Sequence, residues 1–160
     1  MGDVKCLVAR DVLAVTIADE RKHGRRIVFT NGCFDLLHPG HIRILCESGK
    51  FGDVLVVGIN DDDSVCRLKG RGRPIYPAEE RAEILLATRW VDFVTVFAEA
   101  TPKETIEHVR PDVLVKGAEY LQKDIVGASF VREYGGRVVR VRMKPGQSTR
   151  RIVARIAGME

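Results

Sequence analysis

The stretch Thr30-Asn31-Gly32-Cys33-Phe34-Asp35-Leu36-Leu37-His38-Pro39-Gly40-His41 places two histidines three residues apart, just after an apolar run. The run 26–29 predicts a strand, a glycine then permits a turn, and Pro39 suits the first position of a helix. The free backbone amides and the positive end of such a helix attract an anion. His38 and His41 would flank that anion, so the stretch predicts a phosphate-binding turn between a strand and a helix.

Strand and helix patterns alternate along the rest of the chain. Short Val- and Ile-rich runs predict five strands, at about 26–31, 53–59, 92–97, 112–115 and 137–142. Helices are predicted near 40–50, 61–67, 77–89, 102–109 and 123–134, with a last helix capped near Ser148. Such strands are typical of a sheet buried on both faces. We therefore expect an α/β fold, a Rossmann-like doubly wound parallel five-stranded sheet, with its ligand at the carboxyl ends of the strands.

The N-terminal part, residues 1–25, is expected to be a helical extension. Residues 11–23 predict a helix packed outside the core, which would span 26–156. A length of 160 residues suits one compact domain and hardly two, so we expect a single domain over 1–160. Farther along, Thr101-Pro102-Lys103-Glu104 fits a capping box at the start of a helix.

Composition indicates a water-soluble globular protein. Hydrophobic residues make up 45% of the chain and charged residues 30%, and no apolar run approaches the roughly 20 residues that span a bilayer. The N-terminus shows no long apolar segment of a secretion signal. We therefore expect a cytoplasmic protein that does not enter a membrane.

Four cysteines are widely separated, at positions 6, 33, 46 and 66. They form no CxxC pair and have no histidine at zinc-ligand spacing. This pattern predicts reduced, mostly buried thiols, with neither a disulfide nor a structural metal.

The stretch from Phe34 to His41 resembles the HxGH signature of the nucleotidyltransferase superfamily, in the FDxxHxGH form of its cytidylyltransferase-like members. Further motifs of that superfamily follow in the same order and rough spacing: Arg67-Leu68-Lys69-Gly70 with Arg73-Pro74, Glu80-Arg81, Pro111-Asp112-Val113-Leu114-Val115-Lys116-Gly117 and Gly146-Gln147-Ser148-Thr149. The resemblance covers roughly residues 26–156. The stretches 30–41 and 114–120 most resemble the adenylyltransferases that convert D-glycero-beta-D-manno-heptose 1-phosphate into ADP-heptose for lipopolysaccharide or related surface glycans.

The resemblance implies direct in-line transfer of AMP from ATP to a sugar 1-phosphate, with release of pyrophosphate. It assigns catalytic roles to His38, His41 and Lys69. Contacts with nucleotide and phosphates are expected from Thr30, Asn31, Gly32, Cys33, Phe34, Gly40, Arg81, Lys116, Gly117, Glu119, Ser148 and Thr149. Contacts with the sugar phosphate are expected from Asp35 and Arg73. Magnesium is expected to arrive with ATP, held by phosphate oxygens and water, so no protein ligand for a metal is predicted.

Several of these residues also have simpler interpretations. His38 alone would be an ordinary loop histidine, and Asp35 a turn former bonded to its own backbone. Lys69 lies in a charged loop of the kind that is usually solvated. Arg81 would form an exposed ion pair with Glu83 or another neighbour.

Two positions depart from the pattern of the resembling proteins. Arg150 replaces a third hydroxyl residue after Ser148 and Thr149, and either contacts phosphate or points to solvent. Glu119 stands where relatives commonly have aspartate, so its contact is left open. Ser148 acts as an ordinary helix cap in either case.

Other functions remain as alternatives. One is a cytidylyltransferase that acts on glycerol phosphate or ethanolamine phosphate, and another is a non-catalytic nucleotide-binding protein, against which the intact histidine pair argues. A net charge of +4 and a pI near 9.0 raise the possibility of nucleic-acid binding, but the basic clusters carry no interleaved aromatics.

In many bacteria the heptose activity is fused behind a sugar kinase, for which this length leaves no room, so a stand-alone transferase is expected. The resemblance also implies a homo-oligomer.

Overall fold

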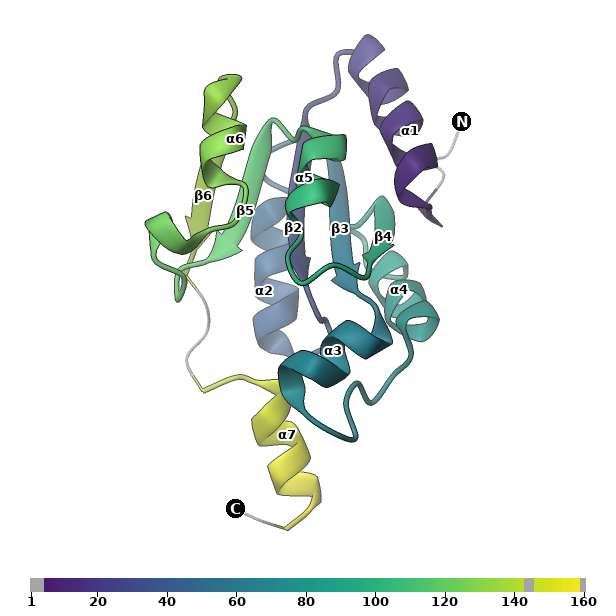
Figure 1. Cartoon of the computed structure of the whole chain (residues 1–160), viewed down its shortest axis with the longest axis vertical. Helices are drawn as coiled ribbons and strands as arrows, with labels where there is room; N and C mark the ends of the chain where they lie inside the picture. Colours follow the sequence, from purple (N-terminus) through teal and green to yellow (C-terminus); the bar gives the residue numbers. More distant parts are fainter. Residues whose placement is uncertain (1–4, 143–145, 159–160) are drawn as a thin grey trace.

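The computed structural model of the chain describes residues 5–142 and 146–158. Within these residues six strands form one parallel sheet: β1 Cys6–Leu7, β2 Ile27–Gly32, β3 Val54–Asn60, β4 Phe93–Phe97, β5 Val113–Gly117 and β6 Arg137–Val141. The strand order is β1-β4-β3-β2-β5-β6 (Figure 1). From β2 the chain first builds the sheet on one side and then crosses to the other. The switch point therefore lies between the carboxyl ends of β2 and β5.

Helices cover both faces of this sheet. They are α1 Arg10–Lys22, α2 Pro39–Ser48, α3 Asp62–Lys69, α4 Ala78–Leu86, α5 Lys103–Val109, α6 Ala128–Glu133 and α7 Thr149–Ile156, with a 3-10 turn at Gln122–Asp124. Side chains from α1, α5 and α6 build one core with the sheet, and those from α2 and α4 build a second core on the opposite face. Beyond the carboxyl ends of the strands lie α3 and α7 (Figure 1). The predicted doubly wound α/β fold is confirmed.

The central strands follow from their apolar composition. All seven residues of β3 are buried, as expected for a strand with a helical layer on each face. Alternate residues of β2 enter different cores: Ile27 and Phe29 face the layer with α1, whereas Val28 faces the layer with α2. This alternation fixes the register of β2, which pairs with β3 from Ile27↔Val54 onward.

The N-terminal segment belongs to the sheet and to the core, which corrects two expectations. β1 adds a sixth strand by pairing in parallel with β4, through Cys6↔Phe93 and Leu7↔Val94. Leu13 and Ile17 of α1 are fully buried in the same core as Ile27. The prediction of five strands and of a helix outside the core was therefore wrong.

The helix predicted near 102–109 is confirmed as α5, but the capping box predicted for it and the helix predicted over 123–134 were wrong. α5 begins at Lys103 with Pro102 at its cap, and no side chain caps it, so the capping box from Thr101 does not form. Glu104 instead lies 3.4 Å from Arg10 of α1. The helix predicted over 123–134 is reduced to α6, because Gly127 takes a left-handed conformation with φ 80° just before it.

The cysteines differ from the prediction of mostly buried thiols. All four are free, three of them are partly exposed, and Cys66 is exposed. Within residues 5–142 and 146–158, none of the helices is long and apolar enough to span a bilayer.

Candidate active site

The loop after β2 brings His38 to the start of α2. His38 is the cap of this helix, and its Nδ1 accepts a hydrogen bond from the Gly40 amide at 3.1 Å. A ring nitrogen that accepts carries no hydrogen, so the neutral ring presents its hydrogen on Nε2. Burial lowers the pKa of His38, a residue that is 7% exposed. His38 is therefore a neutral hydrogen-bond donor at physiological pH.

His41 stacks on His38 one helical turn further along. The ring centroids lie 3.8 Å apart with 24° between the planes, and Phe34 lies 5.1 Å from the His41 ring. Burial, together with the charge that His38 would carry, lowers the pKa of His41 to about 3. Its Nδ1 is buried without a hydrogen-bond partner among the described residues. Two neutral imidazoles thus stand together at a helix N-terminus.

Gly40 allows this arrangement because a side chain there has no room. A Cβ on Gly40 would lie 2.8 Å from Cε1 and 2.9 Å from Nδ1 of His38, and 3.5 Å from Cβ of Gln147. The last of these contacts shows that the segment 146–149 lies next to the start of α2, although more than 100 residues separate them in the sequence.

The N-terminus of α7 lies near the N-terminus of α2. Ser148 caps α7 by accepting a hydrogen bond from the Arg151 amide at 3.2 Å. The Thr149 hydroxyl donates to the Asp35 carbonyl at 2.7 Å, which ties the start of α7 to the loop that precedes α2. The amide-bearing ends of two helices therefore lie near each other, an arrangement suited to a polyphosphate. Arg150 is exposed.

Asp35 and Arg73, both expected at the sugar phosphate, are bonded to each other. Asp35 is 1% exposed, and its carboxylate accepts hydrogen bonds from the Arg73 guanidinium and from the amides of Ile75 and Tyr76. Burial opposes ionisation of this carboxyl, but these bonds outweigh it and hold its pKa below the ordinary value. Asp35 is not bonded to its own turn, in contrast to the simpler interpretation.

Arg81 is buried, not in an exposed pair with Glu83. Its guanidinium donates to the carbonyls of Tyr76 at 2.9 Å, Cys33 at 2.7 Å and Asn60 at 2.9 Å. It also donates to the Asp62 carboxylate at 2.7 Å. Arg81 thus joins the ends of β2 and β3 to the loop before α4, and the expected phosphate contact stays a prediction.

At the end of β5, Lys116 reaches across the switch point. Its Nζ donates to the Asn31 carbonyl at 3.2 Å and lies 5.4 Å from the centroid of the Tyr120 ring. Burial lowers the pKa of Lys116 to about 8, against a smaller opposing effect of Glu119. A Cβ on Gly117 would lie 2.1 Å from the Glu119 carboxylate, which folds back over that glycine. These residues bring β5 into the same site as the histidine loop.

The remaining predicted residues line the same region with unsatisfied or exposed groups. Thr30 Oγ1 and Asn31 Oδ1 are buried without a hydrogen-bond partner among the described residues. Gly32 ends β2, and the Cys33 thiol donates to Asn60 Oδ1 at 3.8 Å. Lys69 is exposed at the end of α3. Among the described residues, unpartnered buried hydroxyls also occur away from this region, at Ser48, Thr95 and Thr105, so the unpartnered atoms of β2 do not by themselves locate a ligand.

Sequence reasoning missed Asn60 and Asp62, which hold Arg81 in place. Both belong to the run Asn60-Asp61-Asp62-Asp63, which begins with the last residue of β3. Polar residues at the carboxyl end of a buried parallel strand are a signal for a site at that edge of the sheet. Among the described residues, no group of three or more His, Cys, Asp or Glu side chains gathers as a metal site would require.

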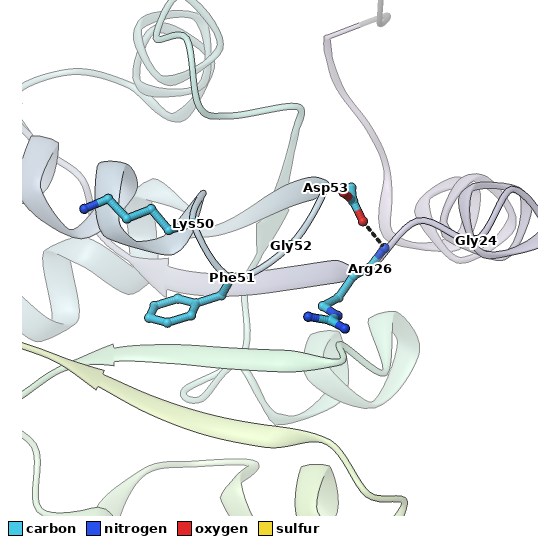
Figure 2. A pocket seen from close by; sticks show the side chains of 6 residues that line it. All are labelled: Gly24, Arg26, Lys50, Phe51, Gly52 and Asp53. Atoms are coloured by element: carbon cyan, nitrogen blue, oxygen red, sulfur yellow. Dashed lines mark hydrogen bonds between the residues drawn. The ribbon is translucent and has the colours of Figure 1, made fainter.

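Two hollows lie at the amino ends of the strands, opposite the candidate site. Figure 2 shows the larger, of about 360 Å³, where the Asp53 carboxylate accepts a hydrogen bond from the Arg26 amide at 2.8 Å. Its lining residues are Gly24, Arg26, Lys50, Phe51, Gly52 and Asp53. The second, of about 270 Å³, lies beside Asp112 and Arg137 at the starts of β5 and β6. Ligands of doubly wound sheets bind at the carboxyl ends of strands, so neither hollow is the candidate site.

The fold, together with the two histidines at the start of the helix at its switch point, defines the class of protein as a nucleotidyltransferase. The chain belongs to the cytidylyltransferase-like family, whose model matches residues 29–154. It is 52% identical over 155 residues to the bifunctional protein HldE of Geobacter sulfurreducens, covering 97% of this chain and 31% of that protein. It is 47% identical to HldE of Pseudomonas aeruginosa over 97% of this chain and 33% of that protein.

A solved structure shares the fold. The lipopolysaccharide core biosynthesis protein of Thermoplasma volcanium is 31% identical, with a TM-score of 0.63, over 76% of this chain and 99% of that one. The chain spans about a third of the length of the curated relatives named above.

Replacing Lys116 with methionine is expected to stabilise the fold at pH 7 by about 2 kcal/mol. The folded pKa of about 8 lies below the ordinary 10.5. The unfolded chain therefore binds more protons between these values, and the contribution of Lys116 to the unfolding free energy rises with pH across that window. The extra free energy of unfolding of Lys116→Met should accordingly vanish as the pH rises from 8 to 10.5.

Urea denaturation at pH 7 and pH 10 measures this effect. Lys22→Met, at a side chain that is 76% exposed, serves as the control and should change stability little at either pH. A Lys116→Met variant that is less stable than the wild type at pH 7 would show that the bond to Asn31 outweighs the cost of burial.

Proposed function

We propose that the chain is an adenylyltransferase that moves AMP from ATP to D-glycero-beta-D-manno-heptose 1-phosphate, giving ADP-heptose and pyrophosphate. The single observation that carries the proposal is the stacked neutral pair His38 and His41 at the N-terminus of α2, next to the N-terminus of α7. The substrates are proposed from the resemblance of residues 30–41 and 114–120, and from the similarity to HldE proteins along most of the chain.

The reaction needs no covalent intermediate. An oxygen of the sugar 1-phosphate attacks the α-phosphorus of ATP and forms a new P–O bond, while the bond from that phosphorus to the bridging oxygen breaks and its electron pair leaves on pyrophosphate. Negative charge builds on the α-phosphate oxygens and on the leaving oxygen. Hydrogen-bond donors fixed before the reaction lower the barrier, because they need no reorganisation when this charge appears.

The neutral histidines suit this role. Nε2 of His38 carries a hydrogen because Nδ1 accepts from Gly40, and the low pKa of His41 keeps its ring neutral throughout the physiological range. We propose that both rings donate to the α-phosphate region. A neutral donor stabilises the developing charge without the cost of burying a cation in the ligand-free site.

The start of α7 and the basic residues around the switch point would bind the rest of the ATP molecule, namely its outer phosphates and its nucleoside. The α7 start, with the Ser148 and Thr149 segment, is placed for the outer phosphates, and Lys69 of the exposed α3 end for the same polyanion. For Lys116 and Gly117, at the end of β5, we propose contact with the nucleoside. Dependence on ATP favours action in the cytoplasm.

Magnesium fits this site as part of the nucleotide. Asp35 and Asp62 are already bonded to Arg73 and Arg81, and no cluster of three ligand side chains occurs in the described part of the chain. Mg²⁺ would thus be held mainly by phosphate oxygens and water, and would neutralise phosphate charge.

Release of pyrophosphate with Mg²⁺ tests the proposal. ATP with D-glycero-beta-D-manno-heptose 1-phosphate should release pyrophosphate in proportion to the sugar phosphate, and ATP alone should not. CTP with glycerol 3-phosphate or phosphoethanolamine is run alongside, because the matching family is named after cytidylyltransferases. Release only with CTP would keep the chemistry and replace the substrates, whereas release with neither pair would refute the assignment.

A further inference from the structure

We propose that Asp35 is a positioning residue that fastens the loop between α3 and α4, residues 70–77, and the start of α7 beside the histidine pair. Its carboxylate would then make no contact with substrate. The inference deepens the proposed function and uses that reaction for one of its readouts. Its principal readout, the protection of the loop from a protease, needs no substrate.

The carboxylate of Asp35 has no capacity left for a ligand. Oδ2 accepts from Arg73 Nε at 2.8 Å, from Arg73 Nη2 and from the Ile75 amide at 2.9 Å. Oδ1 accepts from the Ile75 amide at 3.0 Å and from the Tyr76 amide at 3.2 Å. A carboxylate has about four lone-pair directions, and protein donors fill them here. With 1% of the residue exposed, a substrate has no access to it.

The backbone around Asp35 supports this role. Phe34 has φ 49° and Leu36 has φ 48°, a left-handed conformation on both sides of Asp35 that non-glycine residues rarely adopt. Bonds from distant segments must hold such a turn. Four donors come from the α3–α4 loop, two nitrogens of Arg73 and the amides of Ile75 and Tyr76, and one comes from α7, the Thr149 hydroxyl, which bonds to the Asp35 carbonyl.

These bonds divide the α3–α4 loop into a held half and a free half. Arg73 and Pro74 are partly buried, and Arg81 holds the Tyr76 carbonyl at 2.9 Å. The segment 69–72, which contains Lys69 and Arg71, is exposed, and its two glycines have positive φ. Lys69, the last residue of α3, and Arg71 lie directly before the held half of the loop, so release of residues 73–77 from Asp35 would allow the backbone around both to open further. α7 is tied to the same residue through the bond from Thr149 to the Asp35 carbonyl.

Asp35→Asn tests the inference, because asparagine keeps the size but replaces one acceptor oxygen by a donor. We expect trypsin to cut the folded variant after Lys69 and Arg71 at least about tenfold faster than the wild type, since local opening controls proteolysis of a folded protein. Arg73→Met should produce a similar effect, and the double variant should add little to either single one. Mass spectrometry of the fragments identifies the cuts.

Asp53→Asn is the matched control. The Asp53 carboxylate likewise accepts a hydrogen bond from a backbone amide, that of Arg26 (Figure 2), but at the amino ends of the strands. Asp53→Asn should leave the cuts after Lys69 and Arg71 unchanged, and it should leave the turnover unchanged. In the proposed reaction, Asp35→Asn should lower kcat roughly 10²-fold with a much smaller change in KM for the sugar phosphate, because misplaced groups act on the reacting geometry.

The alternative role gives a different result. If Asp35 binds the sugar phosphate, Asp35→Asn raises KM for that substrate while the loop stays protected, and the inference is overturned. Should Asp35→Asn fail to fold by circular dichroism, Arg73→Met alone decides, and an unchanged rate of loop cleavage in it refutes the inference. Failure of the proposed reaction would leave the proteolysis result interpretable.

Discussion

Replacing His41 with alanine should lower turnover by roughly 10²–10⁴-fold while leaving the fold intact. The variant loses the ring that stacks on His38 at 3.8 Å, and with it one neutral donor at the N-terminus of α2. The defect should be the same at pH 6 and pH 8, because the pKa of His41 is lowered to about 3 and the ring does not titrate in that range. Steady-state pyrophosphate release at both pH values measures it.

His108→Ala is the control for this variant. His108 is an exposed histidine on α5 that contacts only its own helix through the Glu104 carbonyl at 2.7 Å, as far as the described contacts go. It should retain full turnover. Near-normal turnover in His41→Ala, with its fold verified by circular dichroism, would sink the proposed mechanism.

Arg81→Met should destabilise the protein by about 3 kcal/mol or more. The variant removes the donor to the carbonyls of Cys33, Asn60 and Tyr76, and these acceptors lie around a side chain that is 1% exposed. Buried acceptors left without a donor cost more than the bond itself contributed. Urea denaturation measures the loss, with no ligand present.

Arg132→Met provides the comparison for Arg81→Met. Arg132 is exposed on α6, and its replacement should change the unfolding free energy by less than about 0.5 kcal/mol. The two roles considered for Arg81 predict opposite patterns. A phosphate ligand alone would raise KM for the nucleotide at unchanged stability, whereas an internal tie lowers stability before any substrate is added.

The elements that could be predicted from the sequence are those whose pattern is local. The apolar runs of β2 to β6 and the turn into α2 depend on neighbouring residues, and the structure confirms them. β1 could not be predicted, because two residues form a strand only through their pairing with β4. The capping box at Thr101 failed for a related reason: Glu104 lies beside Arg10 of α1, a contact that no local pattern records.

The same division applies to the candidate site. The backbone of the histidine turn follows from Pro39 and Gly40, and the two rings meet because one helical turn separates them. Most partners of Asp35 and Arg81 could not be foreseen, because they lie 19 to 48 residues away along the chain and only the folded sheet brings them close. In the folded protein these charged side chains are buried, and they form hydrogen bonds within the protein.

The short strand β1 also bears on solubility. It covers part of β4, whose residues Phe93-Val94-Thr95-Val96-Phe97 contain no charge and strongly favour strands. A segment of that composition left at a sheet edge promotes aggregation by pairing with other chains. The opposite edge, β6, carries exposed Arg137 and Arg140, which discourage such pairing. A fragment cut to the family match at 29–154 would lose β1 and the buried side chains of α1, and would expose β4 to self-association.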